Sequence, residues 1–130
     1  MLRVGVGCRR GISAEAVVRA VQTVFAENGL DTAAIRGVCS IDLKQDETGL
    51  LEFASSHGTK ICFYSPEELL KAPGDFSDSA FVKKTTGVGN VCERAAVLAA
   101  GENASLIVKK QTGHGVTAAL AVCRRTVRWR

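Results

Sequence analysis

Short apolar blocks recur along the chain, separated by stretches in which apolar residues follow helical spacing. The apolar blocks predict five buried strands, at residues 2–6, 38–43, 60–64, 105–109 and 115–122. The stretches between them predict helices at residues 14–28, 47–57, 66–71, 78–84 and 91–100. Strand and helix therefore alternate through the first half of the chain, and two strands follow one another near its end.

Local signals mark several helix boundaries. Ser13 can cap the first helix, and Gly29 is placed to end it. Ser65, Pro66 and Glu68 have the spacing of an N-cap, a first-turn proline and a capping box. The helix at 91–100 is almost entirely apolar, so we expect it to be buried on most sides.

This order of elements predicts the fold class. Alternating strands and helices favour parallel strands joined by right-handed crossovers. Residues 111–114 form the predicted turn of a C-terminal antiparallel hairpin. The sequence thus predicts an α/β protein: a three-layer α/β/α domain with a mixed five-stranded sheet, parallel in its first half. We expect one domain over residues 1–123 and a basic tail over 124–130.

Composition narrows the class of protein. The chain has 130 residues, is 46% hydrophobic, and contains no apolar stretch near the ~20 residues that span a bilayer. The net charge of +4 comes from the tail, because without its arginines the rest of the chain is neutral. A broad basic face with stacking aromatics, typical of nucleic-acid binders, is not present. The N-terminus lacks the apolar run of a signal peptide, so we expect a cytoplasmic protein without a membrane partner.

The cysteines predict neither a disulfide framework nor a zinc site. There are five of them, widely spaced, with no C-x-x-C pair. We expect them to be reduced and to bind no metal, and the sequence indicates no cofactor. Cys8 follows a strand and precedes a helix beside Arg9, a setting that could activate a nucleophile. No histidine motif accompanies it, so a structural role is favoured.

Two glycine-rich loops lead into helices and carry the main chemical signal. They are residues 5–11 (GVGCRRG) and residues 85–90 (TTGVGN). A helix N-terminus has unpaired N–H groups, and glycine lets an anion approach them. Arg9 and Arg10 would reinforce anion binding at the first loop. The glycine spacing differs from the dinucleotide and nucleoside-triphosphate motifs, so the loops predict a site for another polyanionic small molecule. Tight structural turns are the alternative.

Taken in order, several segments resemble the C-terminal domain of the CbiG/CobE family of cobalamin-biosynthesis proteins. The segments are residues 5–11, 40–44 (SIDLK), 49–51 (GLL) and 87–93 (GVGNVCE), and the resemblance runs from about residue 4 to residue 122. It implies a protein that handles a corrin precursor. Full-length cobalt-precorrin-5A hydrolases of this family open a lactone on the macrocycle, release acetaldehyde, and carry an additional N-terminal domain. The resemblance is compatible with a stand-alone CobE-like protein or with one domain of a hydrolase.

The candidate site residues lie near the two loops. Asp42 and Glu93 are the candidate water-activating carboxylates, although an ion pair or a helix-dipole interaction would equally explain them. Alternation along the second strand would place Asp42 and Lys44 on one face. The remaining residues expected to bind substrate are Gly7, Cys8, Arg9, Arg10, Gly11, Ser13, Lys44, Gly87, Val88, Gly89 and Asn90.

Three functions remain open on the sequence. The first is a part of cobalt-precorrin-5A hydrolase that works with an N-terminal hydrolase domain or other corrin-pathway enzymes. The second is a non-catalytic module that binds or carries a tetrapyrrole. The third, least favoured, is a nucleic-acid-binding domain that uses the basic tail.

Overall fold

The computed structural model describes residues 2–123, except for the side chains of residues 81 and 85. The predicted basic tail at 124–130 lies outside the described residues. Five strands form one mixed sheet in the order β3-β2-β1-β5-β4. The strands are β1 (Leu2–Cys8), β2 (Ile35–Ile41), β3 (Ile61–Tyr64), β4 (Ala104–Gly113) and β5 (Val116–Cys123).

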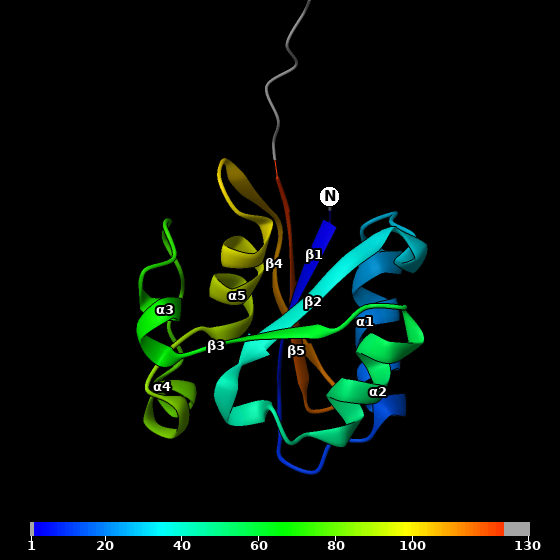
Figure 1. Ribbon diagram of the computed structural model, residues 1–130, viewed down its shortest axis with the longest axis horizontal. Helices are drawn as coiled ribbons and strands as arrows, with labels where there is room; N and C mark the ends of the chain where they lie inside the picture. The colour runs from blue at the N-terminus through cyan, green and yellow to red at the C-terminus, as the bar shows by residue number, and fades with distance from the viewer. Residues whose placement is uncertain (1, 124–130) are drawn as a thin grey trace, which may run out of the picture.

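Helices cover both faces of this sheet, as Figure 1 shows. Helices α1 (Ala14–Glu27) and α2 (Thr48–Ser56) pack on one face, and α5 (Val91–Ala100) packs on the other. The short helices α3 (Pro66–Leu70) and α4 (Ala80–Thr86) lie on the α5 side. The central β1 pairs in parallel with β2 and antiparallel with β5. The predicted three-layer α/β/α domain with a mixed sheet is therefore confirmed.

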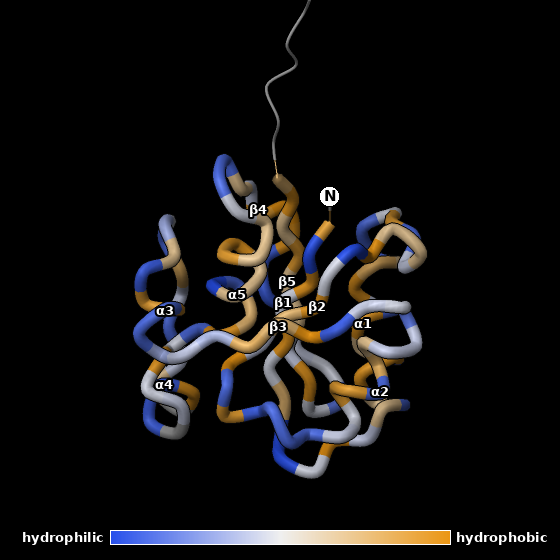
Figure 2. Tube along the Cα trace, in the orientation of Figure 1, coloured by the Kyte–Doolittle hydropathy of each residue, from blue (hydrophilic) through white to orange (hydrophobic). Residues whose placement is uncertain are grey.

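The hydrophobic core is divided by the sheet into two parts. Val4 and Val6 of β1 pack with α1 and α2, whereas Cys39 and Ile41 of β2 pack with α5. The central strands are mostly hydrophobic along the chain, and the peripheral turns are mostly hydrophilic (Figure 2). This separation explains why short apolar blocks indicated the number and order of the strands, although not all of their ends.

Gly5 allows α5 to lie directly on β1. A Cβ atom at Gly5 would overlap the carbonyl oxygen of Cys92 and lie 2.8 Å from the backbone nitrogen of Ala96. The contact is between two backbones, so a rotamer change cannot relieve it. Gly5 thus fixes the distance between the sheet and the helix whose N-terminus borders the candidate site.

Several predicted boundaries are confirmed at the level of hydrogen bonds. Ser13 caps α1 by accepting from the Ala16 N–H at 3.1 Å. Ser65 and Glu68 form the predicted capping box at the start of α3. Helix α5 spans the predicted residues. None of the helices within residues 2–123 combines the length and the apolar character needed to cross a membrane.

The predicted end of the second strand is wrong. β2 ends at Ile41, and Asp42–Lys44 form a 3-10 turn, η2. The backbone N–H of Gln45 donates to the Asp42 carbonyl at 3.0 Å, which turns the chain towards α2. Asp42 and Lys44 therefore do not share one face of a strand.

The hairpin turn is also shifted relative to the prediction. β4 continues through Gly113, and the turn consists of His114 and Gly115, both with positive φ. The apolar pattern ended at residue 109 because β4 is an edge strand whose later residues are polar. The predicted antiparallel pairing of β4 with β5 is correct.

Candidate functional site

A cavity of about 860 Å³ opens where β1 and β2 end, beside the N-terminus of α5. Ligands of open α/β sheets commonly bind beyond the carboxyl ends of the strands. Hydrophobic side chains from β2, η2, α4 and α5 contribute to the lining, together with polar groups from the hairpin. The lining residues are Gly7, Cys8, Arg9, Arg10, Ile41, Leu43, Lys44, Ser79, Val82, Thr86, Gly89, Asn90, Val91, Cys92, Lys110, Thr112, Gly115 and Thr117.

The charged residues of the lining are all cationic. They are Arg9, Arg10, Lys44 and Lys110, and no Asp, Glu or His of residues 2–123 joins them. Arg9 and Lys44 form no ion pair with a described carboxylate. The Arg9 guanidinium lies over Gly115, where a Cβ atom would come within 2.5 Å of Nε. The cavity can therefore offer Arg9 and Lys44 to an external anion without first breaking an ion pair.

Arg10 differs from Arg9 because internal carboxylates already neutralise it. Its Nη1 lies 3.1 Å from Asp46 and 3.3 Å from Glu47, and its Nη2 donates to the Leu43 carbonyl at 3.2 Å. The Gly11 N–H donates to Glu47 at 2.9 Å, and Glu47 is only 4% exposed. A carboxylate of the protein itself thus holds the Gly11 N–H that the sequence assigned to a ligand. Gly11 is not part of the cavity lining.

Other predicted residues also have internal roles. Ser13 is outside the cavity lining and caps α1. Gly87 has a φ of 83° and ends α4, while Val88 is fully buried beside Leu69 and Val91. Gly89 and Asn90, the last residues of the second loop, line the same cavity as Arg9 of the first.

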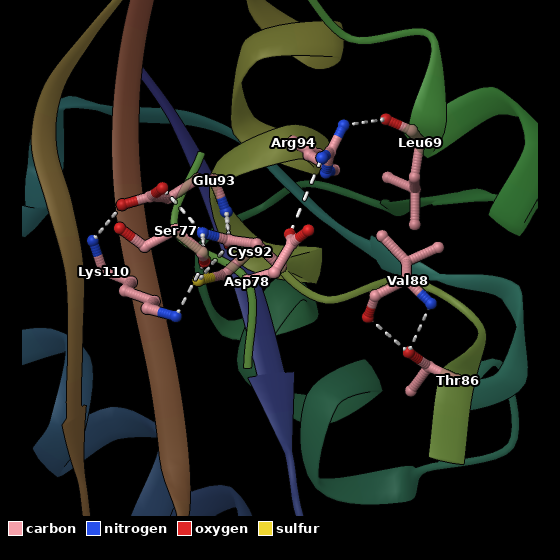
Figure 3. Close-up of polar contacts among 10 residues, drawn as sticks. Leu69, Ser77, Asp78, Thr86, Val88, Cys92, Glu93, Arg94 and Lys110 are labelled. Atoms are coloured by element: carbon pink, nitrogen blue, oxygen red, sulfur yellow. Dashed lines mark hydrogen bonds and ion pairs between the residues drawn. The ribbon is translucent and has the colours of Figure 1, made fainter. Parts of the chain in front are cut away.

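The two candidate catalytic carboxylates lie outside the cavity lining. Asp42 is in the η2 turn. Glu93 is 4% exposed, and both of its oxygens accept hydrogen bonds. Oε1 accepts from Asn90 Nδ2 at 2.7 Å. Oε2 accepts from the Lys110 backbone N–H, also at 2.7 Å (Figure 3). Glu93 therefore joins α5 to β4 in this structure.

The family described as Cobalamin synthesis G C-terminus matches residues 2–121 of this chain. The chain belongs to this family. It is 38% identical over 126 residues to a cobalt-precorrin-5A hydrolase of Priestia megaterium, a match covering 94% of this chain and 32% of the hydrolase. The chain thus spans about a third of the length of that relative.

Shorter relatives of the family match along most of their length. Protein CobE of Sinorhizobium sp is 34% identical, with 92% of this chain and 79% of CobE covered. A crystal structure of CobE, described as a protein from the cobalamin (vitamin B12) biosynthetic pathway, superposes with a TM-score of 0.86 at 34% identity. The superposition covers 93% of this chain and 89% of that one. The resemblance to the CbiG/CobE family is therefore confirmed.

The cavity of this family member contains no activated thiol. Burial raises the pKa of Cys8 to about 11, although nearby Lys44 partly opposes the shift. Burial likewise raises the pKa of Cys92 to about 12. Both thiols are protonated at neutral pH, whereas a thiolate would be needed for nucleophilic attack. All five cysteines are free. Residues 2–123 hold no cluster of three or more His, Cys, Asp or Glu suited to a metal ion.

These thiols give a prediction for alkylation by iodoacetamide. At pH 8 the exposed Cys62 is expected to react first, while Cys8 reacts slowly although it lines the cavity. The rate of Cys8 alkylation should rise as the pH approaches 11, because the thiol then loses its proton. The Cys8 thiol loses its proton near pH 9 in the unfolded chain and near pH 11 in the folded protein. The free energy of unfolding should therefore fall as the pH rises from about 9 to about 11. Mass spectrometry of labelled peptides and urea unfolding measure the two effects. Rapid Cys8 labelling at pH 7 would contradict the assignment.

Lys110 and Thr112 are not among the predicted site residues. A lysine at the end of a strand is usually solvated, and Thr112 lies beyond the predicted fourth strand. Their spacing carried a usable signal, since residues two apart on a strand share a face. Both line the cavity from β4. Lys110 also donates from Nζ to the Ser77 carbonyl at 3.1 Å.

Proposed function

We propose that this chain binds a corrin precursor in the cavity, through the carboxylates at the rim of the macrocycle. The proposal rests on a lining that combines hydrophobic side chains with Arg9 and Lys44, which form no ion pair with a described carboxylate. The lining itself contains no Asp or Glu of residues 2–123. A corrin precursor has the complementary chemistry, namely an apolar ring edged with acetate and propionate groups. The volume of about 860 Å³ lies in the ordinary range of small-molecule sites, about 300–1,000 Å³.

The N-terminus of α5 supports the same proposal. Val91 and Cys92, in its first turn, line the cavity together with the cap residue Asn90. A helix N-terminus favours negative charge through its N–H groups and its dipole. Arg9 and Lys44 approach the cavity from the ends of two other elements, so separate carboxylates of one ligand can be bound at separate points.

Binding without catalysis is the form of this function that the site supports best. Lactone hydrolysis requires a group that activates water. Asp42 and Glu93 lie outside the lining, and the lining thiols are protonated at neutral pH. We therefore propose that the chain acts as a CobE-like binding module, or as the corrin-binding third of a hydrolase whose N-terminal part supplies the remaining chemistry. We place it in the cytoplasm, which five free thiols favour.

Calorimetric titration with cobyrinic acid, a corrin with free peripheral carboxylates, tests the proposal. We expect saturable binding that weakens as salt is raised, and much weaker binding of the fully methyl-esterified form. Deleting residues 124–130 should leave binding intact, whereas a nucleic-acid-binding protein would lose its affinity for nucleic acid. Equal affinity for the acid and its ester would contradict carboxylate recognition.

The same protein can be tested for catalysis with the lactone-bearing precursor. We expect acetaldehyde release to be slow or absent. Release at about one per second or faster, a rate typical of enzymes, would show that the chain is itself a hydrolase.

A further inference from the structure

The strand that carries Lys110 into the cavity is irregular at that residue. The pairing of β4 with β5 shifts register between Val108, which faces Leu120, and Gln111, which faces Ala118. Such a bulge leaves a residue outside the regular ladder and changes the direction of its side chain. The Lys110 N–H lies in this interval and donates to Glu93 Oε2 at 2.7 Å. The carboxylate thus supplies a partner at the bulge.

The helix dipole alone does not explain this arrangement. A carboxylate in the first turn of α5 would interact with the dipole wherever it pointed. Glu93 instead reaches a backbone group of β4, and its other oxygen accepts from Asn90 Nδ2. Burying a carboxylate at 4% exposure is unfavourable unless it is fully hydrogen-bonded. Through these two bonds Glu93 links Asn90, the cap of its own helix, to Lys110 of β4, and both Asn90 and Lys110 line the cavity.

The network continues into the segment that carries α4. The Ser77 carbonyl accepts from Asn90 Nδ2 at 2.9 Å and from Lys110 Nζ at 3.1 Å, as Figure 3 shows for Lys110. The Ser79 N–H donates to the Gly89 carbonyl at 2.7 Å, two residues further along. One end of the α4 wall is therefore attached to the residues that Glu93 holds.

We propose that Glu93 is a positioning residue, which holds Lys110 and Asn90 in the orientation that the cavity uses to bind an anionic ligand. This inference rests on the proposed function. Glu93 lies outside the cavity lining, so it does not contact the ligand. It fixes the β4 bulge, and the bulge directs the Lys110 ammonium to the cavity edge beside Ser77.

A double-mutant cycle distinguishes positioning from general stabilisation. Glu93→Gln keeps the shape of the side chain but leaves a single acceptor for two donors, whereas Lys110→Met removes the ammonium and keeps an apolar stem. We expect Glu93→Gln to weaken cobyrinic acid binding about tenfold in the wild-type background. In the Lys110→Met background the same change should have a much smaller effect, because only the part that acts through Asn90 remains. An equal loss in both backgrounds would overturn the proposal, because a structural defect would weaken binding with or without Lys110.

A second measurement needs no ligand, so it separates this inference from the proposed function. Acetic anhydride labelling followed by mass spectrometry gives the relative reactivity of Lys110 and its exposed neighbour Lys109. We expect Glu93→Gln to raise the Lys110 rate several-fold relative to Lys109. The matched control is Glu47→Gln, which changes a carboxylate of equal burial at the first loop and should leave this ratio unchanged.

The two experiments distinguish a failure of the proposed function from a failure of the positioning role of Glu93. If the wild-type protein does not bind cobyrinic acid, the proposed function fails, and the labelling ratio alone decides on Glu93. An unchanged ratio in folded Glu93→Gln overturns the positioning role. If that variant does not fold, Asn90→Ser replaces it, because serine keeps the cap of α5 but lacks the amide that contacts Glu93 and Ser77. The same increase in Lys110 labelling is expected, and its absence overturns the proposal.

Discussion

Replacing Gly5 with alanine is expected to lower the free energy of unfolding by about 3 kcal/mol or more. The added Cβ would overlap the Cys92 carbonyl oxygen and lie 2.8 Å from the Ala96 nitrogen. Backbone atoms cannot rotate away, so α5 would have to move off β1. That movement would loosen the hydrophobic contacts of α5 with Cys39 and Ile41 and displace one wall of the cavity. Urea unfolding followed by circular dichroism measures the loss.

Gly7→Ala is the matched control for this prediction. Gly7 lies two residues further along β1, and a Cβ atom there would have no neighbour within 4 Å. The free energy of unfolding of the Gly7→Ala protein should stay within about 0.5 kcal/mol of the wild-type value, as for most substitutions that make no new contact. A Gly5→Ala protein as stable as Gly7→Ala would contradict the close backbone contact between β1 and α5.

The double substitution Arg9→Ala and Lys44→Ala is expected to weaken cobyrinic acid binding about a hundredfold. Each cation lines the cavity, and neither forms an ion pair with a described carboxylate. Their loss should therefore affect ligand binding much more than stability. The dependence of affinity on salt should also become shallower, since fewer opposite charges meet in the complex. Calorimetry at two salt concentrations measures both effects.

Arg36→Ala with Lys60→Ala provides a control with the same change in net charge. Arg36 lies at the start of β2, and Lys60 precedes β3, so both are at the opposite end of the strands from the cavity. This control should bind cobyrinic acid as the wild-type protein does. An equal loss in the control would show that net charge, rather than placement in the cavity, governs the affinity.

Local sequence signals were reliable where a few neighbouring residues complete the interaction. The capping box of Ser65 and Glu68 closes within one helical turn, so its spacing was enough to locate α3. Helix α5 was located because an almost entirely apolar segment, with Glu93 and Arg94 as its charged residues, precedes Gly101, which ends the helix. The alternation of strands and helices similarly predicted the three layers and the hairpin.

Signals were less reliable where a residue's partner is distant along the chain. The first loop has the sequence of an anion site, yet Glu47 accepts from Gly11 and pairs with Arg10, more than 30 residues away in the sequence. Arg9 and Arg10 are adjacent, and only the position of α2 relative to the loop makes one paired and the other available. Spacing along a chain cannot distinguish them.

The sequence by itself determined the order of elements, the presence of two glycine loops that precede helices, and membership of the CbiG/CobE family. These features depend on short-range periodicity, capping and glycine geometry, which are encoded in neighbouring residues. Only the tertiary structure decided which cations face the cavity, that Glu93 joins α5 to β4, and that Lys110 belongs to the site. Those outcomes depend on how helices pack across the sheet and on a bulge in β4, because packing brings together donors and acceptors that are far apart in the sequence.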